Sequence, residues 1–213
     1  KTWAFCLDDR SLRKWNIFMK IGICSGYFNP ITVAHLDYLN EAKSLCDILI
    51  VIVNNDEQVL RKESCPFQNE KCRLKIIDNL KCVDQAVLSI DKDGTIAETL
   101  KKIIGDYNFI YSAFSKMFGE KNDIDWFFPK GGDRSDENKL PSKEVTVCKD
   151  FDIEIKYGIG GFEKVTSSSK LIDDATKWNN LKFIKRIRSL IDSGKIDAVN
   201  EVEFVLEELK KSL

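Results

Sequence analysis

The stretch KIGICSGYFNPITVAHLDYL, residues 20–39, decides the fold. Its apolar run at 21–24 is typical of a strand, and the Ser25–Gly26 pair that follows is typical of a tight turn. A helix is expected to begin near Thr32, because apolar residues recur from there at helical spacing. These residues are Val33, Leu36 and Leu39. A strand, a glycine turn and a helix in this order make the first half of a nucleotide-binding α/β unit.

His35 lies one turn into the predicted helix and is the only histidine in the chain. The start of a helix offers unpaired backbone N–H groups and a partial positive charge, and both suit a phosphate group. A lone histidine is usually an ordinary surface or core residue. Its place just after a glycine turn favours a functional role here, and we expect its side chain to be exposed.

The composition limits the class of protein. A chain of 213 residues suits one α/β domain with additions. The net charge of −1 creates no field that would recruit nucleic acid or an anionic membrane. Seven cysteines without a C-x-x-C pair, together with one histidine, argue against a zinc site or any other metal held by the protein itself. An odd number of cysteines and the lack of a membrane-spanning apolar run predict a cytoplasmic protein with reduced thiols.

Apolar runs alternate with helical patterns along the rest of the chain. We expect further strands at 47–53, 83–90, 125–129 and 153–157, the last at an edge of the sheet. This order predicts the α/β class, with a Rossmann-like doubly wound parallel sheet of about five strands and a C-terminal helical extension. The aromatic residues within 105–123 predict a buried inserted helix rather than a stacking platform. They are Tyr107, Phe109, Tyr111, Phe114 and Phe118.

The chain divides into three predicted parts: an N-terminal extension at 1–18, the α/β domain at 19–176 and a helical hairpin at 177–213. The first arm of the hairpin begins at Trp178 and ends at the Ser193–Gly194 break. A basic amphipathic helix of this kind binds membranes or acidic partners in some proteins, but it more often packs. We favour packing, and a homodimer interface is one place for it.

Polar residues follow the predicted strands, at the edge where open α/β sheets bind ligands. Asn54, Asn55 and Asp56 end the second strand, although these residue types also form ordinary turns. Arg61 and Lys62 follow as a basic pair in a loop. Either cation could fold over a triphosphate or stay solvated.

Two later segments also place residues suited to phosphate at the end of a strand or the start of a helix. The fourth strand ends in KGGDR at 130–134, where two glycines allow a ligand to approach the backbone and the flanking cations suit phosphate. Pro141 is expected in the first turn of the helix that comes next. Hydroxyl residues at 167–169 begin a further helix, where they could bind the β- and γ-phosphates of a nucleotide or simply cap the helix.

Residues 26–35, GYFNPITVAH, resemble the Gly-x-Phe-Asp-x-x-His-x-Gly-His signature of the cytidylyltransferase-like nucleotidyltransferases. Asn29 stands where the signature has Asp, Thr32 where it has its first His, and Ala34 where it has Gly. Threonine at that first position is also the pattern of the phosphopantetheine adenylyltransferases. The substitution therefore does not by itself argue against activity.

Downstream motifs resemble the same superfamily in the right order. The spacing of 54–56, 61–62 and 69–73 and the Lys-Gly-Gly-Asp at 130–133 are similar to the heptose-1-phosphate adenylyltransferase and glycerol-3-phosphate cytidylyltransferase types. Residues 165–172 resemble the Ile-Ser-Thr-Ser/Thr-x-Ile-Ile element that closes the triphosphate site. The arginine that precedes this element in the family is replaced by Phe162, and Lys164 is the nearest cation.

The resemblance implies transfer of a nucleoside monophosphate from CTP or ATP to a sugar phosphate or a polyol or alcohol phosphate, with release of pyrophosphate. Mg²⁺ is expected on the triphosphate, held mainly by phosphate oxygens and water. The implied catalytic residues are His35, Thr32 and Lys62. The implied nucleotide-binding residues are Gly26, Tyr27, Phe28, Asn29, Lys130, Gly131, Gly132, Asp133, Arg134, Ser167, Ser168 and Ser169.

Three other functions stay open. A nucleotide-binding module that has lost catalysis would explain Asn29, Thr32 and the absent arginine. A dinucleotide-dependent oxidoreductase is disfavoured, because no Gly-x-Gly-x-x-Gly follows the first strand. A purely structural protein would leave the ligand-like strand ends unexplained.

Overall fold

The computed structural model describes residues 18–62, 66–118, 123–131, 140–161 and 167–193. Its centre is a five-stranded, all-parallel sheet in the order β3-β2-β1-β4-β5. The strands are β1 (Phe18–Gly26), β2 (Ile48–Val53), β3 (Gln85–Leu88), β4 (Asp123–Gly131) and β5 (Glu154–Ile159). The predicted Rossmann-like parallel sheet is confirmed, and so is the position of the last strand at an edge.

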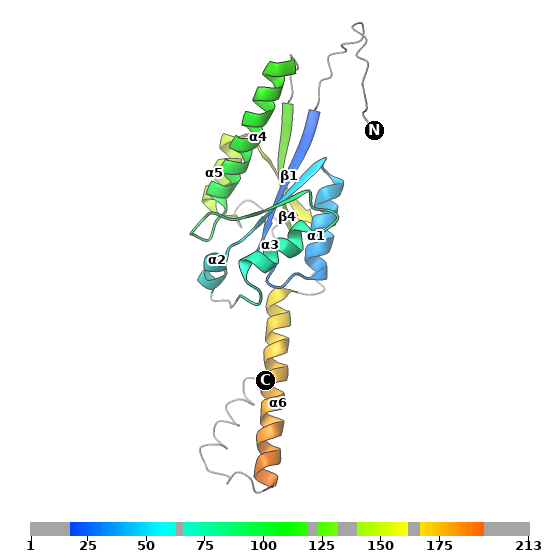
Figure 1. Ribbon diagram of the computed structural model, residues 1–213, viewed down its shortest axis with the longest axis vertical. Helices are drawn as coiled ribbons and strands as arrows, with labels where there is room; N and C mark the ends of the chain where they lie inside the picture. Colours follow the sequence, from blue (N-terminus) through cyan, green and yellow to red (C-terminus); the bar gives the residue numbers. More distant parts are fainter. Residues whose placement is uncertain (1–17, 63–65, 119–122, 132–139, 162–166, 194–213) are drawn as a thin grey trace, which may run out of the picture.

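The described part of the chain has six helices, of which α1 to α5 lie between strands and α6 follows the last strand (Figure 1). They are α1 (Val33–Ser44), α2 (Asp56–Arg61), α3 (Glu70–Asp78), α4 (Ala97–Phe118), α5 (Ser142–Asp150) and α6 (Ser168–Asp192). None of these described helices is both long and apolar enough to cross a membrane.

The core lies on both faces of the sheet, because successive side chains of a strand point to opposite faces. Ile50 and Ile52 of β2 pack with residues of α4 and α5 on one face. Leu49 and Val51 of the same strand pack with residues of α1 and α3 on the other. A strand buried on both faces reads as a continuous apolar run, which is why β2 could be recognised in the sequence.

Two expectations about helices are wrong in part. The segment after Leu100 is no separate buried insertion, because α4 continues to Phe118 and Phe109 is 76% exposed. The side chains of Phe114 and Phe118 lie outside the described residues. Val33, which we assigned to the apolar face of α1, is 58% exposed.

The C-terminal helix also begins earlier than predicted. α6 starts at Ser168 and continues through Trp178 without a break, so the predicted boundary at 176/177 falls inside one helix. Figure 1 shows α6 extending away from the sheet, and Trp178 is 64% exposed on it. The predicted N-terminal extension, apart from Phe18 in β1, and the second arm of the hairpin lie outside the described residues and stay predictions.

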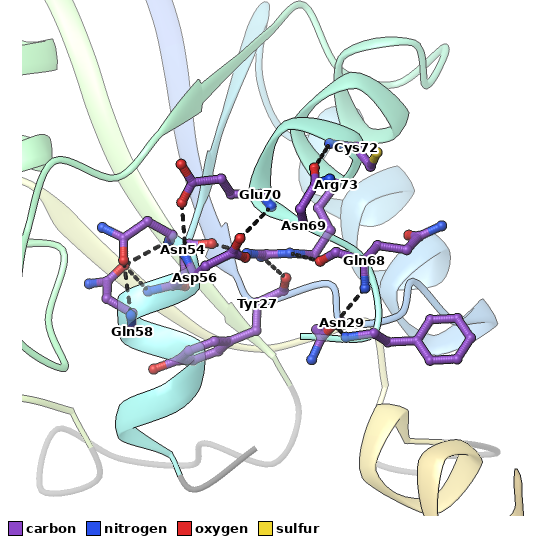
Figure 2. Close-up of polar contacts among 12 residues, drawn as sticks. Tyr27, Asn29, Asn54, Asp56, Gln58, Gln68, Asn69, Glu70, Cys72 and Arg73 are labelled. Atoms are coloured by element: carbon purple, nitrogen blue, oxygen red, sulfur yellow. Dashed lines mark hydrogen bonds and ion pairs between the residues drawn. The ribbon is translucent and has the colours of Figure 1, made fainter. Parts of the chain in front are cut away.

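A buried arginine joins the loops at the carboxyl edge of the sheet (Figure 2). Arg73 of α3 is 1% exposed, and its Nη1 donates to the backbone oxygens of Tyr27 and Asn54, both at 2.7 Å. Its Nε donates to the Gln68 backbone oxygen at 3.0 Å, and its Nη2 forms an ion pair with the Asp56 carboxylate at 2.6 Å. One planar guanidinium therefore fixes the turn after β1, the end of β2 and the start of α2 relative to α3.

The starts of α2 and α3 are also tied directly to each other. The Glu70 carboxylate accepts the Asp56 N–H at 2.9 Å, and the Asp56 carboxylate accepts the Glu70 N–H at 3.1 Å (Figure 2). Each helix thus places a negative charge at the positive end of the other. The short helix α2 was not expected from the sequence, so Arg61 belongs to a helix and not to a loop.

Replacing Arg73 tests how much this arrangement contributes to stability. Arg73→Met is expected to lower the free energy of unfolding by about 3–5 kcal/mol, because three backbone carbonyl oxygens lose their donor and the Asp56 carboxylate loses its ion pair. The measurement is chemical denaturation at neutral pH. Arg61→Met is the matched control, since the ion pair of Arg61 with Glu57 is exposed and its loss should cost less than about 1 kcal/mol. Equal costs for the two variants would contradict this role of Arg73.

Candidate functional site

A cavity of about 400 Å³ lies at the carboxyl edge of the sheet, where β1, β2, β4 and β5 end. All predicted site residues that the structure describes line it: Gly26, Tyr27, Phe28, Asn29, Thr32, His35, Lys62, Lys130, Gly131, Ser167, Ser168 and Ser169. Another cavity, of about 550 Å³ between β3 and α4, is lined by none of them. Gly132, Asp133 and Arg134 lie outside the described residues, as do Phe162 and Lys164.

The glycine turn is shaped by Phe28. A Cβ on Gly26 would lie 2.8 Å from the Phe28 ring, so only glycine fits at the end of β1. Phe28 itself is buried and has a positive φ of 47°. Its ring meets the His35 imidazole edge-on, with 5.1 Å between the ring centroids. The Phe28 ring therefore packs against the His35 imidazole and supports it. Because the Phe28 side chain is buried, the backbone of this turn is the part that can face a nucleotide.

Asn29 anchors the turn to the segment before α3. Its Oδ1 accepts the Phe67 N–H at 2.7 Å, and the Gln68 N–H lies at 3.5 Å (Figure 2). An aspartate would offer a carboxylate oxygen to the same N–H groups. Asparagine in place of the signature aspartate therefore keeps this contact while it removes one negative charge from the cavity wall.

Thr32 and His35 meet at the start of α1. Thr32 is the N-cap residue, and its backbone N–H donates to His35 Nδ1 at 3.0 Å. Thr32 Oγ1 lies 2.9 Å from the same nitrogen. His35 is half-buried and takes part in capping the helix, so the expectation of an exposed histidine is wrong.

Lys62 is held at the mouth of the cavity by an aromatic ring. It is the C-cap residue of α2, and its Nζ lies 4.1 Å from the centroid of the Tyr27 ring. A cation over an aromatic face is attracted by the ring quadrupole. This contact places the Lys62 ammonium beside the turn after β1, at the cavity wall.

Lys130 is in a different electrostatic state from the one that we expected. It lies inside β4 and is 3% exposed, and its Nζ forms an ion pair with Glu144 at 3.1 Å. The Phe128 ring centroid is 3.5 Å away. Glu144 of α5 also accepts the Ile96 N–H at 3.2 Å, so it joins β4 to the segment that enters α4. Sequence reasoning missed Glu144, because a single glutamate in a helix carries no recognisable signal.

The start of α6 lies beside the glycine turn. Ser168 Oγ donates to the Pro30 backbone oxygen at 2.7 Å, and Ser167 Oγ accepts the Lys170 N–H at 3.2 Å. The predicted helix start at the serines is confirmed. Since α1 also begins at this cavity, two helix N-termini with their partial positive charges flank it.

The last strand reaches the cavity through a close backbone contact. Gly160 has a φ of +84°, and a Cβ there would lie 2.7 Å from Tyr38 Cα in α1. Its N–H donates to Glu41 at 2.8 Å. Glycine thus lets the end of β5 pack directly on α1 and brings Gly161 to the cavity wall.

Other chemistry is limited by the surroundings of the reactive groups. Complete burial raises the pKa of the Cys24 thiol to about 12, so this cysteine near the turn stays protonated and is a poor nucleophile. No cluster of three or more His, Cys, Asp or Glu side chains in the described ranges is placed to hold a metal ion.

Comparisons with known proteins agree with this geometry. Residues 23–128 match the family model described as cytidylyltransferase-like. The FAD synthase of Methanocorpusculum labreanum is 31% identical over 159 residues, which cover 75% of this chain and 97% of that protein. The FAD synthase of Thermoplasma acidophilum is 36% identical over 84 residues, or 38% of this chain and 59% of that protein.

One further relative and one solved structure are also similar to this chain. The bifunctional protein HldE of Rhodopseudomonas palustris is 33% identical over 109 residues, which are 46% of this chain but only 22% of that protein. A solved lipopolysaccharide core biosynthesis protein from Thermoplasma volcanium shares 26% identity over 65% of this chain and 93% of that one, at a TM-score of 0.43. From the family match and the nearly full-length similarity to one FAD synthase, the chain belongs to the cytidylyltransferase-like family of nucleotidyltransferases.

Proposed function

We propose that the protein transfers a nucleoside monophosphate from a nucleoside triphosphate to a phosphorylated small molecule and releases pyrophosphate. The observation that carries this proposal is the meeting of two helix N-termini with His35 and Lys62 around one cavity. All of these groups donate hydrogen bonds or carry positive charge, as a triphosphate requires.

The reaction needs positioning and charge stabilisation more than a covalent intermediate. An acceptor phosphate oxygen attacks the α-phosphorus in line, a new P–O bond forms, and the bond to the β-phosphate oxygen breaks. Lys62 and the start of α6 at Ser167–Ser169 hold the β- and γ-phosphates in this proposal, and His35 donates to the phosphate that bears the developing charge. Mg²⁺ on the triphosphate would offset further negative charge.

We infer ATP as the donor and FMN as the first acceptor to test. The support is the FAD synthase that this chain covers almost completely, since that name implies AMP transfer to FMN. Sugar phosphates of the heptose type are the second acceptor class, supported by the similarity to HldE and by Lys130 and Gly131 at the cavity wall. Polyol and alcohol phosphates, with CTP as their donor, come third.

A nucleotide-binding module without catalysis is the alternative. Asn29 and Thr32 in place of charged or ionisable signature residues favour it. Such a module would bind a nucleoside triphosphate in the same cavity and release no pyrophosphate with any acceptor.

We also infer a cytoplasmic location. The cysteines Cys24, Cys46, Cys72, Cys82 and Cys148 are all unpaired thiols, as is usual in a reducing compartment. The net charge of −1 gives no reason to expect a nucleic-acid partner. A homodimer stays a prediction.

The direct test is a screen for pyrophosphate release. The four nucleoside triphosphates are combined with FMN, heptose phosphates and polyol phosphates in the presence of Mg²⁺. We expect release that depends on both substrates, with ATP and FMN the most active pair. Binding of a triphosphate by calorimetry without release with any acceptor would contradict the enzyme and support the binding module.

Lys62 is expected to contribute mainly to triphosphate binding. Lys62→Ala should raise the KM for the nucleoside triphosphate about tenfold to a hundredfold, the loss expected for a charge-assisted contact. The measurement is steady-state kinetics at saturating acceptor. Lys81→Ala is the matched control, because it removes the same charge at an exposed site that does not line the cavity. Equal kinetics for the two variants would remove Lys62 from the site.

A further inference from the structure

The contact between Thr32 and His35 determines which ring nitrogen carries hydrogen. The Thr32 N–H donates to His35 Nδ1 at 3.0 Å. A backbone N–H can only donate, so Nδ1 is an acceptor and bears no hydrogen. The ring hydrogen therefore lies on Nε2, and the imidazole is neutral.

The Thr32 hydroxyl acts on the same nitrogen. Oγ1 lies 2.9 Å from Nδ1, and because Nδ1 carries no hydrogen, the hydroxyl must be the donor in this contact. The hydroxyl hydrogen that we expected to serve a phosphate is thus directed at the imidazole. Thr32 is itself buried, and both contacts are partly buried at the cavity wall.

The imidazole ring of His35 cannot flip about its Cβ–Cγ bond without losing these contacts. A flipped imidazole would place a C–H group against the Thr32 N–H and leave that buried donor without an acceptor. Phe28 packs edge-on against the ring, and Phe28 is fixed in the core. Protonation of Nδ1 would set its N–H against the Thr32 N–H, so the imidazolium form could donate to Thr32 Oγ1 but would lose the backbone contact of the cap.

We propose that Thr32 is a positioning residue that holds His35 as a neutral hydrogen-bond donor through Nε2. The catalytic consequence rests on the proposed nucleotidyl transfer. His35 then supplies a directed hydrogen bond to a phosphate oxygen and no positive charge. Compensation of the developing charge falls to Lys62, to the starts of α1 and α6, and to the cation on the triphosphate.

Glutamine can imitate a histidine in this state. At the third position of a helix, a glutamine side chain accepts the N–H of the N-cap residue through its oxygen. Its amide nitrogen still donates, as Nε2 does. Glutamate accepts the same N–H but offers no hydrogen to the cavity when ionised. The series His35→Gln, His35→Glu and His35→Ala therefore separates capping, donation and charge.

We expect the kcat of His35→Gln to be at least about tenfold above that of His35→Ala, which is the effect expected of one donated hydrogen bond. The melting temperature of His35→Glu should be close to that of His35→Gln, because both side chains restore the cap. The kcat of His35→Glu should nevertheless be as low as that of His35→Ala. A glutamine variant no faster than the alanine variant, with equal melting temperatures for glutamine and glutamate, would overturn the neutral-donor role.

Thr32 is tested through kcat and KM separately. Thr32→Val removes the hydroxyl and keeps the backbone N–H, so kcat should fall about tenfold while the KM for the triphosphate changes little. Thr32→Ser restores the hydroxyl and should return kcat to within about threefold of the original value. A valine variant with unchanged kcat, or one changed only in KM, would show that Thr32 does not position His35.

The tautomer can be observed without any catalysis. Because the chain has one histidine, ¹⁵N-labelling of histidine gives ring resonances that need no assignment by mutation. We expect a neutral ring protonated at Nε2 in the free protein at pH 7. An imidazolium, or a ring protonated at Nδ1, would overturn the proposal. If no nucleotidyl transfer is found, the proposed function fails, while this spectrum still decides the state of His35.

Discussion

The Arg73 guanidinium is the contact on which the site depends. It binds the carbonyl oxygens of Tyr27 and Asn54 and the carboxylate of Asp56, which belong to two segments remote in sequence, the turn after β1 and the connection from β2 to α2. The turn after β1 can face a ligand only if its backbone is held in place, and Arg73 binds it directly through the Tyr27 oxygen. Burial makes the contact strong, since each carbonyl oxygen would otherwise lie unsolvated.

Charge at the cavity is distributed unevenly, and that determines what each group can do. Lys130 is balanced by Glu144 in a buried pair that joins β4 to α5. The Lys62 ammonium lies over the Tyr27 ring at the cavity wall. His35 is fixed as a neutral donor by Thr32. The site therefore combines a lysine at the cavity wall with hydrogen-bond donors at the starts of two helices, an arrangement suited to in-line transfer of a phosphoryl-linked group.

The sheet and most strands were predictable because their signals are local. A strand such as β2 is apolar throughout when both its faces are buried. The turn predicted at Ser25–Gly26 is wrong, because both residues belong to β1 and the chain turns at 29–30 before α1 begins at Val33. The pairing of Lys130 with Glu144 and that of Arg73 with Asp56 could not be recognised in the sequence. A contact between distant segments leaves no periodic pattern. The length of α4 was misjudged for a related reason: aromatic residues such as Phe109 predict burial, but this part of the helix is solvent-exposed.

A crystal structure with a non-hydrolysable ATP analogue and Mg²⁺ would test the assignment of the site most directly. The phosphates should lie between the starts of α1 and α6, with His35 Nε2 within hydrogen-bond distance of a phosphate oxygen and Lys62 moved from the Tyr27 ring onto the triphosphate. A nucleotide bound in the cavity between β3 and α4, or phosphates that contact neither His35 nor the start of α6, would contradict it.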